Sequence, residues 1–255
     1  MSSPTRDNGE DVLEGLPQAS PRKFSTTRWS LIIAVKQGTT PEAREALSTL
    51  CTLYWYPLYA FTRRQGRGPE DARDLVQGFF TRLLEKNDLA TVDRQRGRFR
   101  TWLLASLKHY LANEWDRERT QKRGGGLTPL SINAETAEGL YQHEPSHDLT
   151  PEKLYERRWA LTLLERVLST LEQDCARLNR QALFEKLRGT LTGDVGQARY
   201  AEVAEALGMS EMAVKVAAHR LRVRYGELLQ AEIAQTVEQP GDIDDEIRLL
   251  LLSLE

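Results

Sequence analysis

The sequence predicts an all-α protein built from two small helical domains joined by a flexible linker. Apolar residues recur at spacings of three and four along most of its 255 residues, which is the period of an amphipathic helix. No run alternates apolar and polar residues between turn residues, so no strand is expected. A stretch near the middle lacks any sustained period, and the length suits two small domains on either side of it.

Composition places the chain among soluble globular proteins. Hydrophobic residues make up 40% and charged residues 28% of it. Its longest apolar runs, Leu31–Val35 and Leu249–Leu252, are far shorter than the roughly 20 residues that span a bilayer, and the N-terminus shows no apolar signal region. We therefore expect a cytoplasmic protein without a membrane partner. Cys51 and Cys175 have neither metal-ligand nor disulfide-framework spacing.

The first domain is expected over residues 24–124, after a disordered tail at 1–23 that is rich in Ser, Pro, Gly and acidic residues. Its first helix begins at Pro41, and glycines from Gly66 onward end it. The second helix opens with the Pro-Glu-Asp start at Pro69, because proline and acidic groups suit a first helical turn.

A basic connector at 88–98 leads into a third helix, which starts at Phe99 and has a charged end. Between Arg94 and Arg123 there are nine Lys/Arg and three acidic residues, a balance of +6 in a chain whose net charge is −2. A basic block with interleaved aromatic residues favours a nucleic-acid partner, although a solvated helix face also explains many charge runs. The candidate DNA contacts in this block are Arg96, Arg98, Arg100, Asn113, Arg117 and Arg119.

The second domain is expected over residues 151–235, after a linker at 125–150. Within it, the segment Tyr200–Tyr225, YAEVAEALGMSEMAVKVAAHRLRVRY, fits a helix-turn-helix: Gly208 ends the first helix and Ser210 caps the second. The second helix should pack through Val214, Ala218 and Leu221 and present its opposite face to the major groove of DNA. Its candidate DNA contacts are Ser210, Glu211, Met212, Lys215, Val216, His219, Arg220 and Arg222. An ordinary helical hairpin is the alternative.

Three stretches together resemble a bacterial RNA polymerase sigma factor of the extracytoplasmic-function (ECF) type, in the sigma-70 family. They are PEDARDLVQGFFTRLLEKN, GRFRTWLLASLKHYLANEWDRER and YAEVAEALGMSEMAVKVAAHRLR, and they occur in the family's order. The resemblance implies that the first domain corresponds to sigma region 2, which binds polymerase and the −10 promoter element. It implies that the second domain corresponds to region 4, which binds the −35 element.

Carried over by position, the resemblance assigns polymerase binding to Asp74, Leu75, Val76 and Gln77. It assigns −10 reading and melting to the connector and the start of the third helix, and −35 reading to Lys215, His219 and Arg220. The expected partners are core RNA polymerase and promoter DNA, and an anti-sigma factor is a further partner that the resemblance allows. No enzymatic activity, cofactor or metal is expected, because no nucleophile–base pair, metal-ligand set or phosphate loop stands out.

Two other functions stay open at this point. One is a stand-alone helix-turn-helix regulator that binds duplex DNA as a dimer, and the other is a helical adaptor without DNA binding. The basic connector argues against the adaptor, and dependence on core polymerase would separate a sigma factor from a regulator.

The C-terminal tail, residues 236–255, is acidic and rich in leucine. From Val237 to Glu255 there are six acidic residues and one arginine, a balance of −5. Acidic residues after Pro240-Gly241 lead into leucines, which predicts a short helix that docks on one of the domains. A sharper hypothesis is that its acidic start lies against a basic DNA-binding surface and restrains the free protein.

Overall fold

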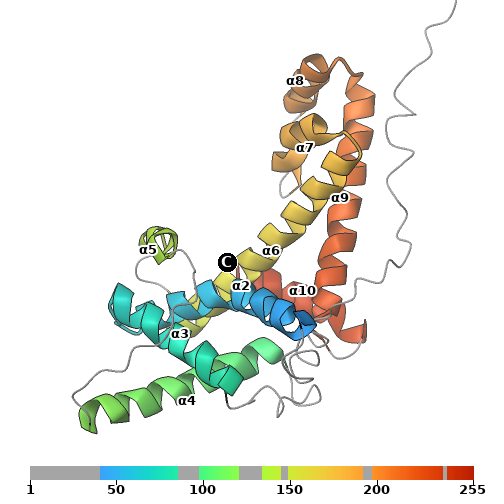
Figure 1. Ribbon diagram of the computed structural model, residues 1–255. Coiled ribbons are helices and arrows are strands. Elements are labelled where there is room, and N and C mark those ends of the chain that lie inside the picture. The colour runs from blue at the N-terminus through green and yellow to red at the C-terminus, as the bar shows by residue number, and fades with distance from the viewer. Residues whose placement is uncertain (1–40, 86–97, 121–133, 145–148, 192–196, 238–239) are drawn as a thin grey trace, which may run out of the picture. The chain divides into compact units, whose positions relative to one another are not determined.

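The computed structural model describes residues 41–85, 98–120, 134–144, 149–191, 197–237 and 240–255 (Figure 1). Every regular element in these ranges is a helix, which confirms the predicted all-α class. The predicted N-terminal tail and most of the basic connector lie outside the described residues. The contacts divide the chain into a larger unit, Ser25–Leu163 with Ile233–Glu255, and a smaller unit whose described residues lie within Leu164–Glu232.

The larger unit is a bundle whose main layer is made by three helices. These are α2 (Pro41–Arg64), α3 (Pro69–Glu85) and α4 (Phe99–Thr120). They pack through the apolar faces that the sequence predicts, because Leu58, Val76 and Leu107 are each completely buried. The rings of Phe99 and Tyr54 form a T-shaped pair with their centroids 5.4 Å apart, so the start of α4 is anchored on α2.

Three further elements complete the larger unit. They are α5 (Ala134–Gln142), the first part of α6 (Pro151–Arg177), and α10 (Ile243–Leu252), which follows the short 3₁₀ turn Pro240–Asp242. The predicted C-terminal helix is therefore present, and it belongs to the same unit as α4. The contacts divide the chain inside α6, between Leu163 and Leu164, whereas the sequence placed the start of the second domain at residue 151. The domain limits inferred from the sequence stay predictions.

Helix α5 is a structural feature that the sequence analysis did not predict, since it lies in the stretch interpreted as a linker. Polar contacts attach it to α2. The Tyr59 hydroxyl donates to Glu138 Oε2 at 2.5 Å, and Arg63 donates to both oxygens of the same carboxylate at 3.0 and 2.8 Å. The partners in these contacts are far apart in the chain, so the sequence alone does not reveal them.

Acidification is expected to loosen α5. Hydrogen bonds from Arg63, helped by one from Tyr59, lower the pKa of Glu138 below its ordinary value despite partial burial. The stability that the Glu138 carboxylate gives to the docked α5 is therefore complete above the ordinary carboxyl pKa. It is lost as pH falls through the lowered pKa of Glu138. Hydrogen exchange of residues 134–142, corrected for intrinsic rates, should accelerate at acidic pH. Glu138→Gln should exchange fast at every pH, and an unchanged variant would contradict the role of this carboxylate.

The smaller unit contains the rest of α6 and three more helices. These are α7 (Gln181–Leu187), α8 (Gln197–Leu207) and α9 (Glu211–Ala234), whose last two residues belong to the larger unit. The 3₁₀ turn Arg188–Thr190 follows α7. Just after the end of α6, Asn179 has a positive φ of 56°, and the Arg180 N–H donates back to the Cys175 carbonyl at 2.8 Å. This closing turn satisfies carbonyls at the helix end, with asparagine in the position that usually prefers glycine.

Candidate nucleic-acid interface

The turn between α8 and α9 has the local chemistry of a helix-turn-helix. Gly208 takes a left-handed φ of 62°, and the Met209 N–H donates to the Ala204 carbonyl at 2.9 Å, which closes the end of α8. The Ser210 Oγ then accepts from the Ala213 N–H at 3.2 Å and caps α9. The roles predicted for Gly208 and Ser210 are confirmed, and together they fix where α9 begins.

One face of α9 packs into the smaller unit. Val214 and Ala218 are completely buried and Leu221 is nearly so, which confirms the predicted packing stripe. Helix α9 is 24 residues long, longer than a reading helix needs to be, because buried Leu228 and Ile233 continue the apolar period. The fixed inner face determines which side chains point outward.

The outward face of α9 carries a line of side chains at spacings of four, three and four residues. Met212 is 69% exposed and Val223 49% exposed, with the exposed Val216 and His219 between them. We call these four residues the α9 line. At 1.5 Å per residue it extends over about 16 Å, a length that fits a major groove. The first three were predicted, whereas Val223 was missed because an isolated valine in a basic segment resembles a core residue.

The charged candidate residues on α9 differ in whether their side chains already contact other residues of the protein. Lys215 Nζ lies 2.7 Å from Glu211 Oε1, so these two pair within the helix. Arg220 is half-exposed. Arg222 donates from Nε to the Thr190 carbonyl and from Nη2 to the Tyr200 hydroxyl, both at 2.9 Å, and thus connects α9 to α8 and to the turn after α7.

Arg222→Ala is expected to lower the free energy of unfolding of the smaller unit by about 1–3 kcal/mol, because it leaves a partly buried carbonyl and hydroxyl without their charged donor. Urea unfolding followed by circular dichroism measures this loss. Arg220→Ala on the neighbouring position is the matched control and should change stability by less than about 0.5 kcal/mol. Equal stability of the two variants would show that the Arg222 contacts are not structural.

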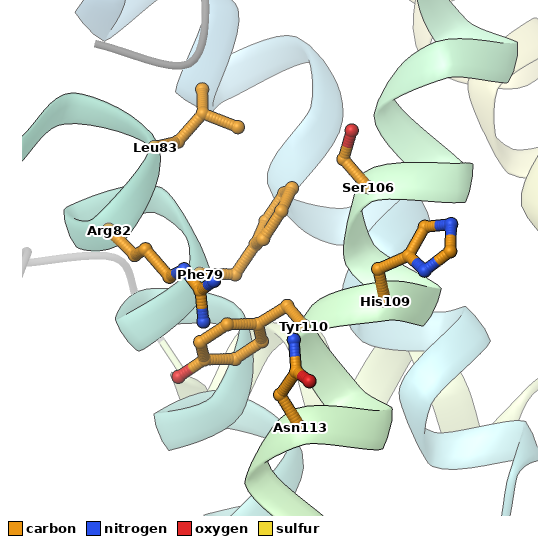
Figure 2. A pocket seen from close by; sticks show the side chains of 7 residues that line it. All are labelled: Phe79, Arg82, Leu83, Ser106, His109, Tyr110 and Asn113. Carbon is orange, nitrogen blue, oxygen red and sulfur yellow. The ribbon is translucent and has the colours of Figure 1, made fainter. Parts of the chain in front are cut away.

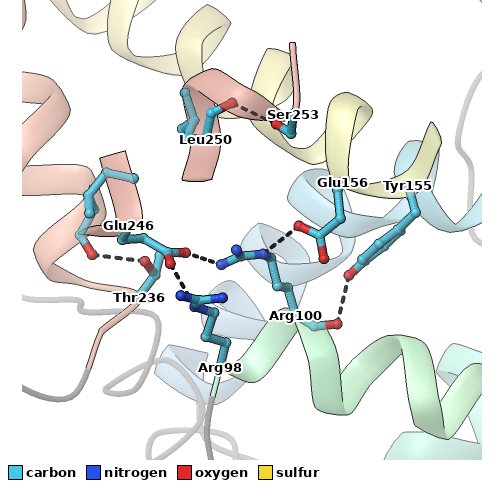
Figure 3. Close-up of polar contacts among 9 residues, drawn as sticks. Arg98, Arg100, Tyr155, Glu156, Thr236, Glu246, Leu250 and Ser253 are labelled. Carbon is cyan, nitrogen blue, oxygen red and sulfur yellow. Dashed lines mark hydrogen bonds and ion pairs between the residues drawn. The ribbon is translucent and has the colours of Figure 1, made fainter. Parts of the chain in front are cut away.

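In the larger unit, two candidate DNA contacts meet the C-terminal helix. Arg98, 41% exposed in its side chain, and the buried Arg100 both pair with Glu246 on α10 (Figure 3). Arg96 lies outside the described residues, and so do the side chains of Arg117 and Arg119.

Asn113, another candidate contact, is exposed beside a shallow pocket between α3 and α4 (Figure 2). The pocket has a volume of about 170 Å³. Its lining residues are Phe79, Arg82, Leu83, Ser106, His109, Tyr110 and Asn113. The rings of Phe79 and Tyr110 are 5.8 Å apart, and the Arg82 guanidinium lies 5.7 Å from the Tyr110 ring. Aromatic faces beside polar and cationic groups are the chemistry that binds an unpaired base.

A family model described as "ECF sigma factor" matches residues 30–231. The chain belongs to the ECF sigma factor family. It therefore acts in transcription initiation, with core RNA polymerase and promoter DNA as the partners of its family. The matched residues include α4, which is the basic helix predicted from the sequence, and the helix-turn-helix formed by α8 and α9. No curated protein and no solved structure matched the chain.

The polymerase-binding candidates of this ECF sigma factor lie on α3. Asp74 is exposed and pairs with the neighbouring Arg73 at 3.3 Å. Leu75, Val76 and Gln77 are buried, so they hold α3 against the rest of the unit. Only the first of the four candidates thus presents its side chain at the surface of this unit, and their contact with polymerase stays a prediction.

None of the described helices of this sigma factor is both long and apolar enough to cross a membrane. No three or more His, Cys, Asp or Glu side chains gather where they could hold a metal ion, again within the residues that the structure describes.

Proposed function

We propose that this sigma factor recognises promoters with both units, reading the −35 element with α9 and opening the −10 element with the larger unit. The α9 line is the observation that carries the proposal. Its members share one face of a capped helix whose opposite face is buried, so they can enter a major groove without disturbing the core.

The chemistry of the α9 line supports direct reading of bases. Met212 and Val216 offer apolar contact to the methyl groups of thymines, and His219 can donate to or accept from a base edge. Arg220 supports a phosphate contact, which positions the helix without specifying sequence.

In the larger unit, the pocket between α3 and α4 supports capture of an unpaired base of the −10 element. A base stacked on Tyr110 would meet polar groups of Asn113 and His109 at the rim. Arg98 directly precedes the same helix, α4, where it can follow the backbone of the opened strand. This chain supplies binding free energy for strand opening, while RNA synthesis belongs to the polymerase. Such a role places the protein in the cytoplasm, with an anti-sigma factor as an additional expected partner.

Reconstitution with core polymerase tests the proposal. The purified full chain, core RNA polymerase and a library of bacterial promoter fragments should give run-off transcripts that neither the polymerase nor the chain gives alone. A stand-alone regulator would instead footprint a palindrome without polymerase, and an adaptor would yield neither result. Failure to bind core polymerase would overturn the proposal.

A further inference from the structure

Helix α10 places a buried carboxylate against the beginning of α4. The side chain of Glu246 has no exposed surface, and its Oε2 lies 2.7 Å from Arg98 Nε. Its Oε1 accepts from Arg100 Nη1, while Glu156 on α6 accepts from Arg100 Nε at 2.7 Å (Figure 3). The Arg100 guanidinium lies 4.1 Å from the Trp159 ring. A carboxylate from the C-terminal tail therefore joins two arginines that are candidates for DNA contact.

Other contacts of the tail hold the carboxylate in this position. Leu250, one helical turn after Glu246, is completely buried, and Arg157 on α6 donates to the Leu254 carbonyl. Thr236 and Val237, which precede α10, are also buried. Thr236 lies in the same closely packed region as Arg98 and Arg100. The tail is thus held by several contacts and not by one ion pair.

The contact uses the chemistry by which arginine binds DNA. A guanidinium recognises carboxylate and phosphate oxygens through the same arrangement of N–H donors. With Glu246 in place, Arg98, Arg100, Glu156 and Glu246 have formal charges that sum to zero. Without Glu246 the sum is +1, and two guanidinium groups lose an anionic partner. A phosphate is the natural replacement.

We propose that α10 is an internal competitor of promoter DNA: Glu246 occupies the phosphate-binding position of Arg98 and Arg100 in the free protein and must leave before the opened −10 strand binds there. This inference rests on the proposed function of the larger unit. It makes DNA binding by the free protein weaker than the binding surface itself would allow, because only the undocked fraction of molecules is competent.

A purely structural role does not explain why a carboxylate occupies position 246. Burying an ion pair stabilises a fold no better than apolar residues of similar size, because desolvation opposes the attraction. An apolar side chain beside Leu250 would hold the tail at least as well. A carboxylate adds one property that an apolar residue lacks, which is that an anion can displace it.

The test compares four forms of the full chain in binding a fluorescein-labelled single-stranded 20-mer of mixed sequence, at 50 and 150 mM salt. They are the unmodified chain, Glu246→Gln, Asp244→Asn, and the chain truncated after Val237. Asp244→Asn is the matched control, because it removes the same charge from an exposed position of the same helix. If ninety-nine molecules in a hundred are docked, truncation should tighten binding by about a hundredfold. Glu246→Gln should tighten it several-fold, because the other contacts of the tail remain. The control should bind like the unmodified chain.

Arg98→Ala, made in the unmodified and the truncated chain, identifies the shared residue. It should weaken DNA binding several-fold more in the truncated chain, where Arg98 is available, than in the unmodified chain, where Glu246 pairs with it. Equal effects in both would overturn the competition. So would equal affinities of the unmodified chain and Glu246→Gln, or equal gains from Glu246→Gln and Asp244→Asn.

Two further measurements keep the inference separate from folding and from the proposed function. Hydrogen exchange of residues 243–252 in the unmodified chain should accelerate when the 20-mer is added, and unchanged exchange would overturn the inference even if a variant failed to fold. Run-off transcription with core polymerase should occur with the truncated chain. If the truncated chain gives transcripts but all four forms bind the 20-mer equally well, the competition is overturned and the proposed function stands. If no form gives transcripts or binds DNA, both the proposed function and the competition are overturned.

Discussion

Replacing Arg100 with alanine is expected to lower the free energy of unfolding of the larger unit by about 3–5 kcal/mol. The substitution leaves the Glu246 carboxylate, which has no exposed surface, without the donor to its Oε1, and it removes the cation from above Trp159. It also removes the partner that joins Glu156 on α6 to α10 through a single guanidinium. Urea unfolding followed by far-ultraviolet circular dichroism measures the loss.

Two controls separate the buried charge from ordinary ion pairing. Lys108→Ala breaks another pair between α4 and α6, the exposed one with Glu152 at 2.6 Å, and should cost at most about 1 kcal/mol. The double variant Arg100→Ala, Glu246→Leu removes the orphaned carboxylate and should recover part of the loss. A single Arg100→Ala variant as stable as Lys108→Ala would contradict this account of the cluster.

The charge of Arg100 does not vary over the accessible pH range. Burial by itself lowers the pKa of Arg100, but the charges and hydrogen bonds of Glu156 and Glu246 outweigh it and raise that pKa above its ordinary value. A group with a raised pKa contributes stability below its unfolded pKa and loses it only as pH rises through the folded one. The arginine side of the cluster therefore stabilises the fold throughout the neutral and mildly alkaline range.

The helices could be predicted from the sequence wherever an apolar period coincides with local end signals. Pro69 with its following acids, and Gly208 with Ser210, act through their own backbone or the next turn, so a reader of the sequence can locate them. Helix α5 has no such signal. Its position depends on Glu138 meeting Tyr59 and Arg63, which are 79 and 75 residues away in the chain.

The candidate site could be predicted to the extent that helical geometry decides it. The helical period of α9 alone placed Met212 and His219 on its outward face. The same period brings Val223, three turns after Met212, to that face, so it could have identified the residue that was missed. The partners of Arg222, by contrast, are set by tertiary packing. Opposite charges predicted attraction between the tail and the basic block, but only the docked helix shows that Glu246 makes the buried contact.

The double variant Met212→Ala, His219→Ala is expected to weaken binding of the holoenzyme to its promoter by about 2–6 kcal/mol. Each lost base contact costs about 1–3 kcal/mol, and the two side chains are about 10 Å apart along α9, so their effects should add. Both are exposed, so the fold should be unchanged. Lys215→Ala should have a smaller effect, because Lys215 already pairs with Glu211.

The measurement compares affinity for a promoter fragment found by run-off transcription with affinity for random DNA of equal length, at one fixed salt concentration. Gln173→Ala, at an exposed position of α6 in the same unit, is the control and should match the unmodified chain on both DNAs. Arg220→Ala should weaken both about equally and reduce the salt dependence by about one phosphate contact. The double variant should lose affinity only for the promoter, because an apolar or imidazole contact to a base edge exists on the correct sequence alone. Equal loss on both DNAs would mean that the α9 line binds DNA without reading it.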